Sequence, residues 1–551
     1  MAIFEEKKPC AGRTICFILV IFALSYSFWD LGMRELFRNE SEYAVAAQEM
    51  NSFPPLITLH GQMQTGIFPL FPALAKGLSA CGLPMEFSLR FISVVSLLAL
   101  VMIVWLACYR TGGIQASAAG AAVMLSTLLA AEKAVEGYPH MLTALILYSG
   151  WLLWFELALG RGNWNLAWIA AGLFGGLAYC NAGVTGLIYF AIPLLIQQRP
   201  LNVWTKLRYP GVPVCLGILA LFILLQWLPQ WEAKMAMAAP VQQEGPAVSG
   251  YFKQLIGFLP DIFFRFLPWS LMLWAPFCSA LIPLDPNPLF GKFHRILFLT
   301  LGVMLWLNPE TRSRDLLYLT PLLAVLIGEF YWIVVRRYGF RFLTAFRFFG
   351  WILLLASILF LGFLYLPESF LQSVLPRLHA LDYRTGVSLI VATLEVLTAF
   401  CLTVTGLILC VRKQAVWKVY LLFFGSMMLL FWGVVNPYRA YNRPRSAMGR
   451  EFRSFLPAEE EGKKPFTIYK DSQISGLYPE CWYMGVRVKT ADTSRQIADD
   501  SETVYVISTG VPAAAGRDWV RLYDTVYKDN RLFLYKGIPR KDETDEYDED
   551  Y

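Results

Sequence analysis

The chain has 551 residues, of which 56% are hydrophobic and 16% are charged, and its formal net charge is +6 at pH 7. Soluble proteins carry about 25% charged residues, so this composition excludes a single soluble domain and indicates a membrane protein. The positive balance gives no case for a nucleic-acid partner, because the basic residues gather in every second loop between apolar stretches.

About thirteen apolar stretches approach the roughly 20 residues that a membrane-spanning helix needs. In chain order they lie near 14–31, 86–108, 113–131, 141–159, 164–180, 183–197, 211–229, 268–284, 294–307, 316–335, 348–366, 387–411 and 417–436. The stretches near 183–197 and 294–307 are short, so they could be half-buried helices or have different bounds. An odd number of spans would place the two ends of the chain on opposite sides of the membrane.

Positive charge in the loops predicts the orientation. Basic residues occur at the N-terminus and in alternate connections: Lys7, Lys8 and Arg13; Arg199, Lys206 and Arg208; Lys292 and Arg295; Arg336, Arg337, Arg341 and Arg347; Arg412, Lys413 and Lys418. We expect these segments, including the N-terminus, to be cytoplasmic and the loops around 32–84, 230–267 and 367–386 to be external. No small-residue cleavage site follows the first apolar stretch, so it is expected to be a retained helix.

The chain beyond about residue 437 changes character. A short amphipathic helix is predicted at 451–456, and alternating, aromatic-rich runs predict strands at 466–470, 503–508, 521–527 and 531–536. The last two runs surround Asp529-Asn530, which suits a hairpin turn. We expect a membrane domain over 1–436 and a small external α/β domain over 437–551, with a disordered, solvated acidic tail at 541–551.

The polar segment after the first apolar stretch carries the candidate chemistry. Asn39, Glu40 and Glu42 precede the run AVAAQEM, whose apolar positions suggest an amphipathic helix lying on the membrane. Glu40 would stand in the first turn of that helix, where the helix dipole favours the ionised carboxylate. The alternative interpretation is that Glu40 and Glu42 are ordinary first-turn acids.

Four segments resemble, in order, motifs of the bacterial PMT-like (family 39) glycosyltransferases, a GT-C group that includes the lipid A aminoarabinose transferases. They are RNESEYAVAAQEM at 38–50, similar to D-E-x-R-Y-A-x-x-A-R-E-M; FSLRFISV at 87–94, similar to R-L-P-S; GLAYCNAGVTGL at 176–187, similar to G-L-A-x-L-T-K-G-P-V-G-L; and FLPWSL at 266–271 with RSRDLLYLTPLLAVL at 312–326, similar to L-P-W-S-L and S-x-K-R-x-x-Y-L-L-P-x-x-P-A-L. Together they extend over essentially the whole chain.

The resemblance implies an all-α polytopic membrane protein of the GT-C fold, with about thirteen transmembrane helices and a small C-terminal α/β extracytoplasmic domain. It implies a multi-pass enzyme of the bacterial inner membrane that transfers a sugar from a polyprenyl-phosphate donor to a glycan, lipid or protein acceptor at the extracytoplasmic face. The implied partners are that donor, the acceptor and membrane lipids.

The departures from the motifs remove charge. Asn39 stands at the usual catalytic Asp, and an amide cannot act as a base; Glu40 and Tyr43 match the family's Glu and Tyr. Ala182 replaces the Lys of T-K-G, and the stretch at 64–69 that aligns with F-E-K-P-P is uncharged. We therefore expect Glu40 to be the base, with Glu42 as the second candidate and Asn39 positioning the acceptor. The alternatives are an inactive relative that binds or assembles lipid-linked glycans, and a polytopic transporter.

Phosphate binding would then rest on cations at external membrane edges. These are Arg34, Arg90, Lys133, Arg312 and Arg314. Arg312 and Arg314 match the family's basic pair before Tyr318, although an interfacial anchor is their alternative role. Glu136 lies near a position where relatives have an acidic residue, and His60 and His140 could lie beside the same cavity.

The sequence indicates no metal site and no cofactor. The cysteines form no CxxC pair, and no two histidines stand at i, i+4. Glu40, Glu42 and Glu136 could supply oxygen ligands to a divalent ion. Nothing in their spacing requires one.

Overall fold

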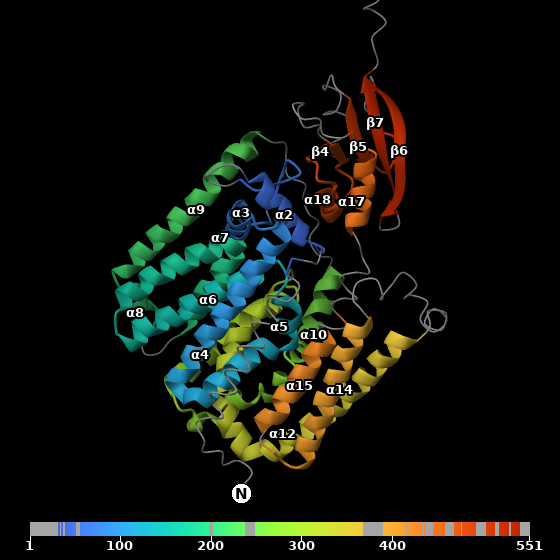
Figure 1. The fold of residues 1–551 in the computed structure, drawn as a ribbon. Helices are drawn as coiled ribbons and strands as arrows, with labels where there is room; N and C mark the ends of the chain where they lie inside the picture. Colours follow the sequence, from blue (N-terminus) through green and yellow to red (C-terminus); the bar gives the residue numbers. More distant parts are fainter. Residues whose placement is uncertain are drawn as a thin grey trace, which may run out of the picture. The chain divides into compact units, whose positions relative to one another are not determined.

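The computed structural model describes residues 31–32, 35–36, 39–50, 56–64, 66–197, 202–236, 248–366, 389–414, 416–431, 435, 445–457, 468–474, 476–491, 503–512, 517–527 and 530–539. The chain divides into two compact units. The helical unit comprises Met1–Arg34, Phe87–Leu228 and Val241–Arg443, and the mixed unit comprises Glu35–Glu86, Pro229–Pro240 and Pro444–Tyr551. Figure 1 colours the elements of both units along the sequence.

Long apolar helices build the helical unit. They are α4 (Met85–Ser126), α6 (His140–Phe155), α7 (Trp164–Ile196), α9 (Gly211–Ala236), α11 (Pro288–Leu307), α12 (Thr320–Tyr365), α14 (Leu389–Val411) and α15 (Val416–Leu430). Shorter elements of this unit are α5 (Leu128–Lys133), η1 (Glu156–Gly160), α8 (Val203–Leu207), α10 (Val248–Arg265) and η5 (Asp315–Leu319). Within the described part of the chain, seven helices are long and apolar enough to cross a membrane, or up to eight if a bent pair counts as one span. The protein is therefore an integral membrane protein.

Several predicted pairs of spans are joined into single long helices. The pair 86–108 and 113–131 falls largely in α4, which is broken at Gly113, and the pair 164–180 and 183–197 falls in α7, which is broken at Gly183. Both glycines adopt a positive φ, which glycine reaches without steric penalty. The count of thirteen stays a prediction, and the first predicted span at 14–31 lies outside the described residues.

The predicted span at 268–284 is not one continuous helix, and whether it crosses the membrane stays a prediction. This segment forms three short 3-10 helices, η2 (Trp269–Met272), η3 (Ala275–Phe277) and η4 (Ile282–Leu284). Pro268, Pro276 and Pro283 interrupt it, and each lacks the N–H that a continuous helix needs. The preceding helix α10 bends by 99° into η2 and η3, so the chain here is a broken span or a re-entrant loop.

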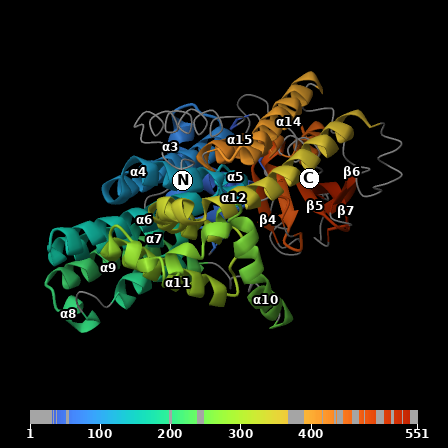
Figure 2. The same ribbon diagram turned by 90° about the horizontal axis from the view of Figure 1, so that it is seen from below.

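Close helix contacts hold the helical unit together. Gly150 of α6 lies against Phe174 and Phe190 of α7, where an added Cβ would come within 2.6 Å of the Phe190 ring. The Trp151 indole N–H donates to the Phe190 carbonyl at 3.0 Å. A second group, α12, α14 and α15, lies side by side in both views (Figures 1 and 2). Close packing of this kind holds the helices of this unit in fixed positions, and with them the polar residues at their ends.

The C-terminal part of the mixed unit is a five-stranded sheet in the order β4-β3-β5-β7-β6. The strands are β3 (Ile468–Asp471), β4 (Val488–Ala491), β5 (Val504–Ser508), β6 (Arg517–Tyr527) and β7 (Asn530–Pro539). β3 is parallel to β4 and β5, whereas β7 is antiparallel to β5 and β6. Helices α17 (Arg445–Ser454) and α18 (Tyr478–Met484) share a buried core with it. The predicted strands are confirmed, whereas Asp529 and the tail at 541–551 lie outside the described residues.

The segment after the first predicted span belongs to the same unit. It forms α2 (Glu40–Glu49), the short hairpin of β1 (Thr58–Leu59) and β2 (Gln62–Met63), and α3 (Leu70–Ala80). The predicted helix after Asn39 is confirmed, with Glu40 as its first residue. The expectation that its apolar face lies on the membrane is wrong. Val45 and Met50 are instead buried in a cluster against which Tyr478 and Trp482 of α18 pack. The expected domain boundary near 436 stays a prediction.

Candidate functional site

The three candidate catalytic residues stand at the N-terminus of α2. Asn39 occupies the N-cap position and is half-buried, and its carbonyl accepts the backbone N–H of Glu42 at 3.1 Å. The Glu40 side chain has no exposed surface, whereas Glu42 is half-buried. Both carboxylates lie in the first helical turn, where the unpaired backbone N–H groups of a helix favour negative charge. The predicted placement of the two acids is confirmed.

The charge of Glu42 affects the pKa of two residues from the C-terminal part of the chain, Tyr478 and Lys470. Burial, followed by the charge of Glu42, raises the pKa of Tyr478 to about 12. Lys470, at the end of β3, is only 3% exposed; its ammonium donates to the Gly476 carbonyl at 3.0 Å and lies 4.9 Å from the centre of the Tyr478 ring. Burial lowers the pKa of Lys470, while Cys481 and Glu42 act in the opposite direction. Sequence analysis missed Lys470, because it reads as the polar end of an ordinary strand.

His60 lies at the tip of the β1–β2 hairpin in the same unit. It is 2% exposed and adopts a left-handed conformation with φ of 53°, which His tolerates better than most residues. Its carbonyl accepts the backbone N–H of Thr490 at 2.8 Å, and its ring lies 5.2 Å from the ring of Tyr478. Neither ring nitrogen has a hydrogen-bond partner among the described residues. Burial, followed by the charge of Lys470, lowers the pKa of His60 to about 3.

Tyr43 has a packing role in the structure. Its side chain is half-buried and meets the ring of Phe71 edge-on, with ring centres 5.5 Å apart. It also borders the apolar cluster around Val45. Tyr43 therefore ties α2 to α3, and its expected substrate contact stays a prediction.

A chain of ion pairs occupies one rim of the helical unit. Acidic and basic side chains alternate along it, from Asp261 through Arg265, Glu132, Lys133 and Glu136 to Arg314. Glu136 is the link between the two predicted cations: it accepts from Lys133 at 3.1 Å and from Arg314 at 3.0 Å. The Arg314 guanidinium also lies 3.8 Å from the centre of the Tyr138 ring. The predicted residues Lys133, Glu136 and Arg314 are thus brought together, with their charges compensated.

Asp315 organises a second polar group beside this rim. Its carboxylate lies 3.3 Å from Nε2 of His140 and accepts the backbone N–H of Arg312 at 2.7 Å. The Tyr318 ring stacks on the His140 ring with centres 6.1 Å apart, and Tyr318 is buried. His140 therefore belongs to the helical unit, whereas His60 belongs to the mixed unit.

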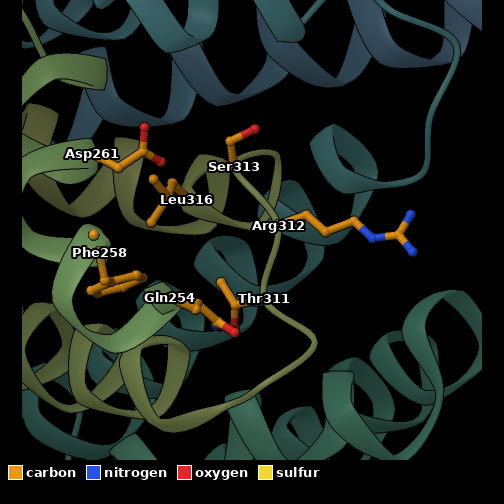
Figure 3. A pocket seen from close by; sticks show the side chains of 8 residues that line it. Gln254, Phe258, Asp261, Thr311, Arg312, Ser313 and Leu316 are labelled. Atoms are coloured by element: carbon orange, nitrogen blue, oxygen red, sulfur yellow. The ribbon is translucent and has the colours of Figure 1, made fainter. Parts of the chain in front are cut away.

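A cavity of about 220 Å³ opens beside Arg312 in the helical unit. The lining residues come from α10, from the loop before η5 and from η5: Gln254, Gly257, Phe258, Asp261, Thr311, Arg312, Ser313 and Leu316. Figure 3 shows the Arg312 side chain extending away from the other labelled side chains. Arg312 is exposed, and no ion pair of its guanidinium occurs within the described ranges. Among the predicted cations that the structure describes, Arg312 is therefore the most accessible to an incoming anion.

The remaining candidates lie elsewhere. Arg90 is 1% exposed, and its guanidinium donates to the Leu31 carbonyl at 2.9 Å, so it secures the chain at the end of the first predicted span. Ala182 lies on α7 next to the break at Gly183. Arg34 lies outside the described residues.

No metal centre is found where the structure describes the chain: no group of three or more His, Cys, Asp and Glu side chains is placed to hold an ion. Glu40 and Glu42 belong to the mixed unit and Glu136 to the helical unit. The expectation that neither a metal nor a cofactor takes part stays a prediction.

Comparison with solved structures identifies the fold. The chain matches ArnT from Cupriavidus metallidurans in the apo state, with a TM-score of 0.68 and 16% sequence identity over 95% of this chain and 98% of that one. It matches the same protein bound to undecaprenyl phosphate with a TM-score of 0.67 and 15% identity, over 94% and 97% of the two chains. An oligosaccharyltransferase from Archaeoglobus fulgidus aligns with a TM-score of only 0.43 and 13% identity, over 91% and 69%.

No protein-family model and no curated protein sequence matches the chain. The match to ArnT nevertheless extends over nearly the full length of both chains. The chain therefore has the fold of ArnT, and the expected GT-C fold is confirmed.

Proposed function

We propose that this protein is a membrane glycosyltransferase that takes a sugar from a polyprenyl-phosphate donor and passes it to a glycan, lipid or protein acceptor. The observation that carries the proposal is the position of α2: in a chain with the fold of ArnT, Glu40 and Glu42 lie in the first turn of the helix that directly follows the position of the family's catalytic carboxylate. The similar ArnT structure was solved with undecaprenyl phosphate, which supports a lipid-linked donor. Reaction at the extracytoplasmic face of a bacterial inner membrane, with a cytoplasmic N-terminus, belongs to the same proposal.

Glu40 is the proposed base. It removes the proton of the acceptor's nucleophilic group as that group bonds to the anomeric carbon, and the bond from that carbon to the phosphate oxygen breaks with its electron pair. Polyprenyl phosphate leaves, and the proton remains on Glu40. Glu40 is shielded from water, which strengthens the electrostatic interactions of a base with its substrate. Glu42 is the second candidate, and the half-buried Asn39 amide would orient the acceptor.

Arg312 and Arg314 are the proposed phosphate ligands, with Arg90 and Lys133 as further candidates. A guanidinium binds phosphate through two parallel hydrogen bonds, which a single ammonium cannot reproduce. Arg312 is accessible beside the 220 Å³ cavity, whereas Arg314 would have to share its charge between the phosphate and Glu136. Arg312 is therefore the stronger candidate for first contact with the donor.

The test is a transfer assay on purified protein in liposomes, supplied with a panel of radiolabelled polyprenyl-phosphate sugars and membrane extract as the source of acceptor. We expect one donor to be consumed with label in a new product. Glu40→Gln should abolish transfer and leave expression and donor binding nearly intact. Unchanged turnover in that variant would remove Glu40 from the chemistry, and the same change at Glu42 shows whether the second candidate carries the role.

A second candidate function is supported by the charge pattern. Asn39 and Ala182 replace charged family residues, and Lys133 and Arg314 are already paired with Glu136. A protein that kept the fold and lost its chemistry could bind lipid-linked glycans without transferring sugar. Restoring the charges at Asn39 and Ala182 tests whether the wild type is such a protein or an active enzyme.

A further inference from the structure

Helix α10 has an exposed apolar face and a second face that lines the cavity beside Arg312. The exposed side chains are large and apolar, and they recur three or four residues apart: Phe252, Ile256, Leu259 and Phe263. The cavity-lining residues recur at the same helical spacing: Gln254, Gly257, Phe258 and Asp261. In a membrane protein the exposed apolar face suits contact with lipid, and the cavity lies on the side of α10 that faces the protein.

Hydrogen bonds hold α10 on both sides of Gly257. The Gln254 amide donates to the Asn308 carbonyl at 2.7 Å, and the Arg265 guanidinium donates to Glu132 at 2.8 Å. Between these two contacts, a Cβ added at Gly257 would meet no atom within 4 Å. The open space is therefore built into the packing of α10 against its neighbours.

The free polar atoms of the cavity are mostly hydrogen-bond acceptors. Oδ1 of Asp261 accepts from Arg265 at 3.2 Å, and Oδ2 accepts no hydrogen bond from the described residues. Gln254 and Thr311 already donate to backbone carbonyls, so the amide oxygen of the first and a lone pair of the second remain. A ligand that fits these atoms must therefore supply hydrogen-bond donors.

The other lining residues add an apolar surface and one cation. Phe258 and Leu316 are both buried and give the cavity apolar walls. Arg312 lines the same cavity, but its side chain extends away from the other labelled side chains (Figure 3). A sugar ring offers C–H groups to apolar walls and hydroxyl donors to the oxygens. A phosphate offers mainly acceptors, which the Asp261 carboxylate repels and a guanidinium binds.

We propose that this cavity binds the sugar ring of the donor, with Asp261 accepting from the sugar hydroxyls and Arg312 binding the phosphate that carries the sugar. The inference rests on the proposed function. The cavity volume of about 220 Å³ suits a single ring, because it is below the roughly 300–1,000 Å³ of pockets that take drug-sized ligands. Hydrogen bonds to an ionised carboxylate are about twice as strong as those between neutral groups, so Asp261 contributes most to recognition of the sugar.

The first test fills the cavity with Gly257→Leu. Leucine should occupy the space of the sugar ring without a clash, and it forms helix more readily than glycine. The matched control is Gly302→Leu. Gly302 lies on α11, where an added Cβ also meets no atom within 4 Å, and it does not line the cavity.

Binding is measured in liposomes with two ligands: the radiolabelled polyprenyl-phosphate sugar that the wild type uses, and undecaprenyl phosphate, which carries no sugar. We expect Gly257→Leu to weaken binding of the first about tenfold or more and to change binding of the second by less than about twofold. Gly302→Leu should bind both ligands as the wild type does.

The second test is Asp261→Asn, which keeps the shape of the side chain and removes its charge. It should weaken binding of the sugar-bearing donor about fivefold or more, because a charge-assisted hydrogen bond is lost. Loss of the contact with Arg265 alone would instead affect both ligands alike. The matched control is Glu310→Gln, which removes an exposed carboxylate outside the cavity and should leave binding unchanged.

The outcomes separate this inference from the proposed function. Absence of transfer by the wild-type protein with every donor would overturn the proposed function, and the inference with it. A wild type that transfers sugar while Gly257→Leu and Asp261→Asn bind the sugar-bearing donor normally would overturn the inference alone. A raised KM for the acceptor, with donor binding unchanged, would place a sugar of the acceptor in the cavity and would also overturn it.

Discussion

Arg314 lies 3.8 Å from the centre of the Tyr138 ring while its Nε donates to Glu136 at 3.0 Å. One guanidinium thus makes a cation–π contact and a charge-assisted hydrogen bond at the same time, which its flat, delocalised shape allows. Its side chain is mostly buried, so both contacts are shielded from salt and solvent. This pair fixes the loop before η5 against the loop after α5.

Arg314→Lys should therefore impair the protein although the charge is kept. A lysine ammonium can bond to Glu136 or lie over Tyr138, but its single point charge does not reproduce both contacts in one position. We expect the variant to lose about tenfold or more in transfer rate and to melt a few degrees lower, consistent with a loss of about 1–2 kcal/mol.

The control for this variant is Arg312→Lys. Arg312 is exposed and has no ion pair within the described ranges, so its replacement should leave the melting temperature unchanged. Thermal unfolding in detergent and the transfer assay measure the two effects separately. An Arg314→Lys protein as stable and active as the wild type would show that the contacts with Tyr138 and Glu136 are dispensable.

Local patterns predicted much of this fold and of its polar residues. The helix that begins at Glu40 follows from first-turn acids before an apolar run, and the strands near the C-terminus follow from alternation. The pairing of Lys133 with Glu136 is likewise local, because the chain turns directly after α5 and brings these two residues together.

Contacts distant in sequence were not predictable in this way. Nothing in the sequence near Val45 shows that Tyr478 and Trp482 cover it, so a face covered by protein was taken for one that lies on lipid. Lys470 was missed as well, because a strand pattern does not show that its ammonium is buried over the ring of Tyr478. The three prolines in 268–284 do indicate that this segment is not one continuous helix, but the prediction gave more weight to its apolar composition.

His60 should make the docking of the β1–β2 hairpin sensitive to acid. Its pKa is about 3 in the folded protein and 6.5 in an unfolded chain. Above pH 6.5 the ring is neutral in both states and has no effect. As the pH falls from 6.5 towards 3, only the unfolded state gains the proton, so stability is lost. At pH 5 the loss amounts to about 2 kcal/mol.

Hydrogen exchange of residues 56–64 at pH 7.5 and pH 5, corrected for intrinsic exchange rates, measures this effect. The wild type should lose protection at pH 5. His60→Asn should lose less between the two pH values, because Asn does not titrate and tolerates the positive φ of this position. An equal loss of protection in both proteins would assign the acid sensitivity to other groups.

Restoring two family charges separates an active enzyme from an inactive relative. Asn39→Asp returns a carboxylate to the N-cap of α2, and Ala182→Lys returns an ammonium beside the break in α7. If the wild type is inactive because these charges are missing, the double variant should gain transfer, since a positioned base contributes about 10²–10⁴-fold. If the wild type is active around Glu40, a second carboxylate next to it should raise the pKa of one of the pair and impair transfer. Transfer assays of both proteins, repeated with Glu40→Gln in each, decide the matter. Activity that appears only in the double variant, and survives Glu40→Gln, would establish the inactive relative and overturn Glu40 as the base.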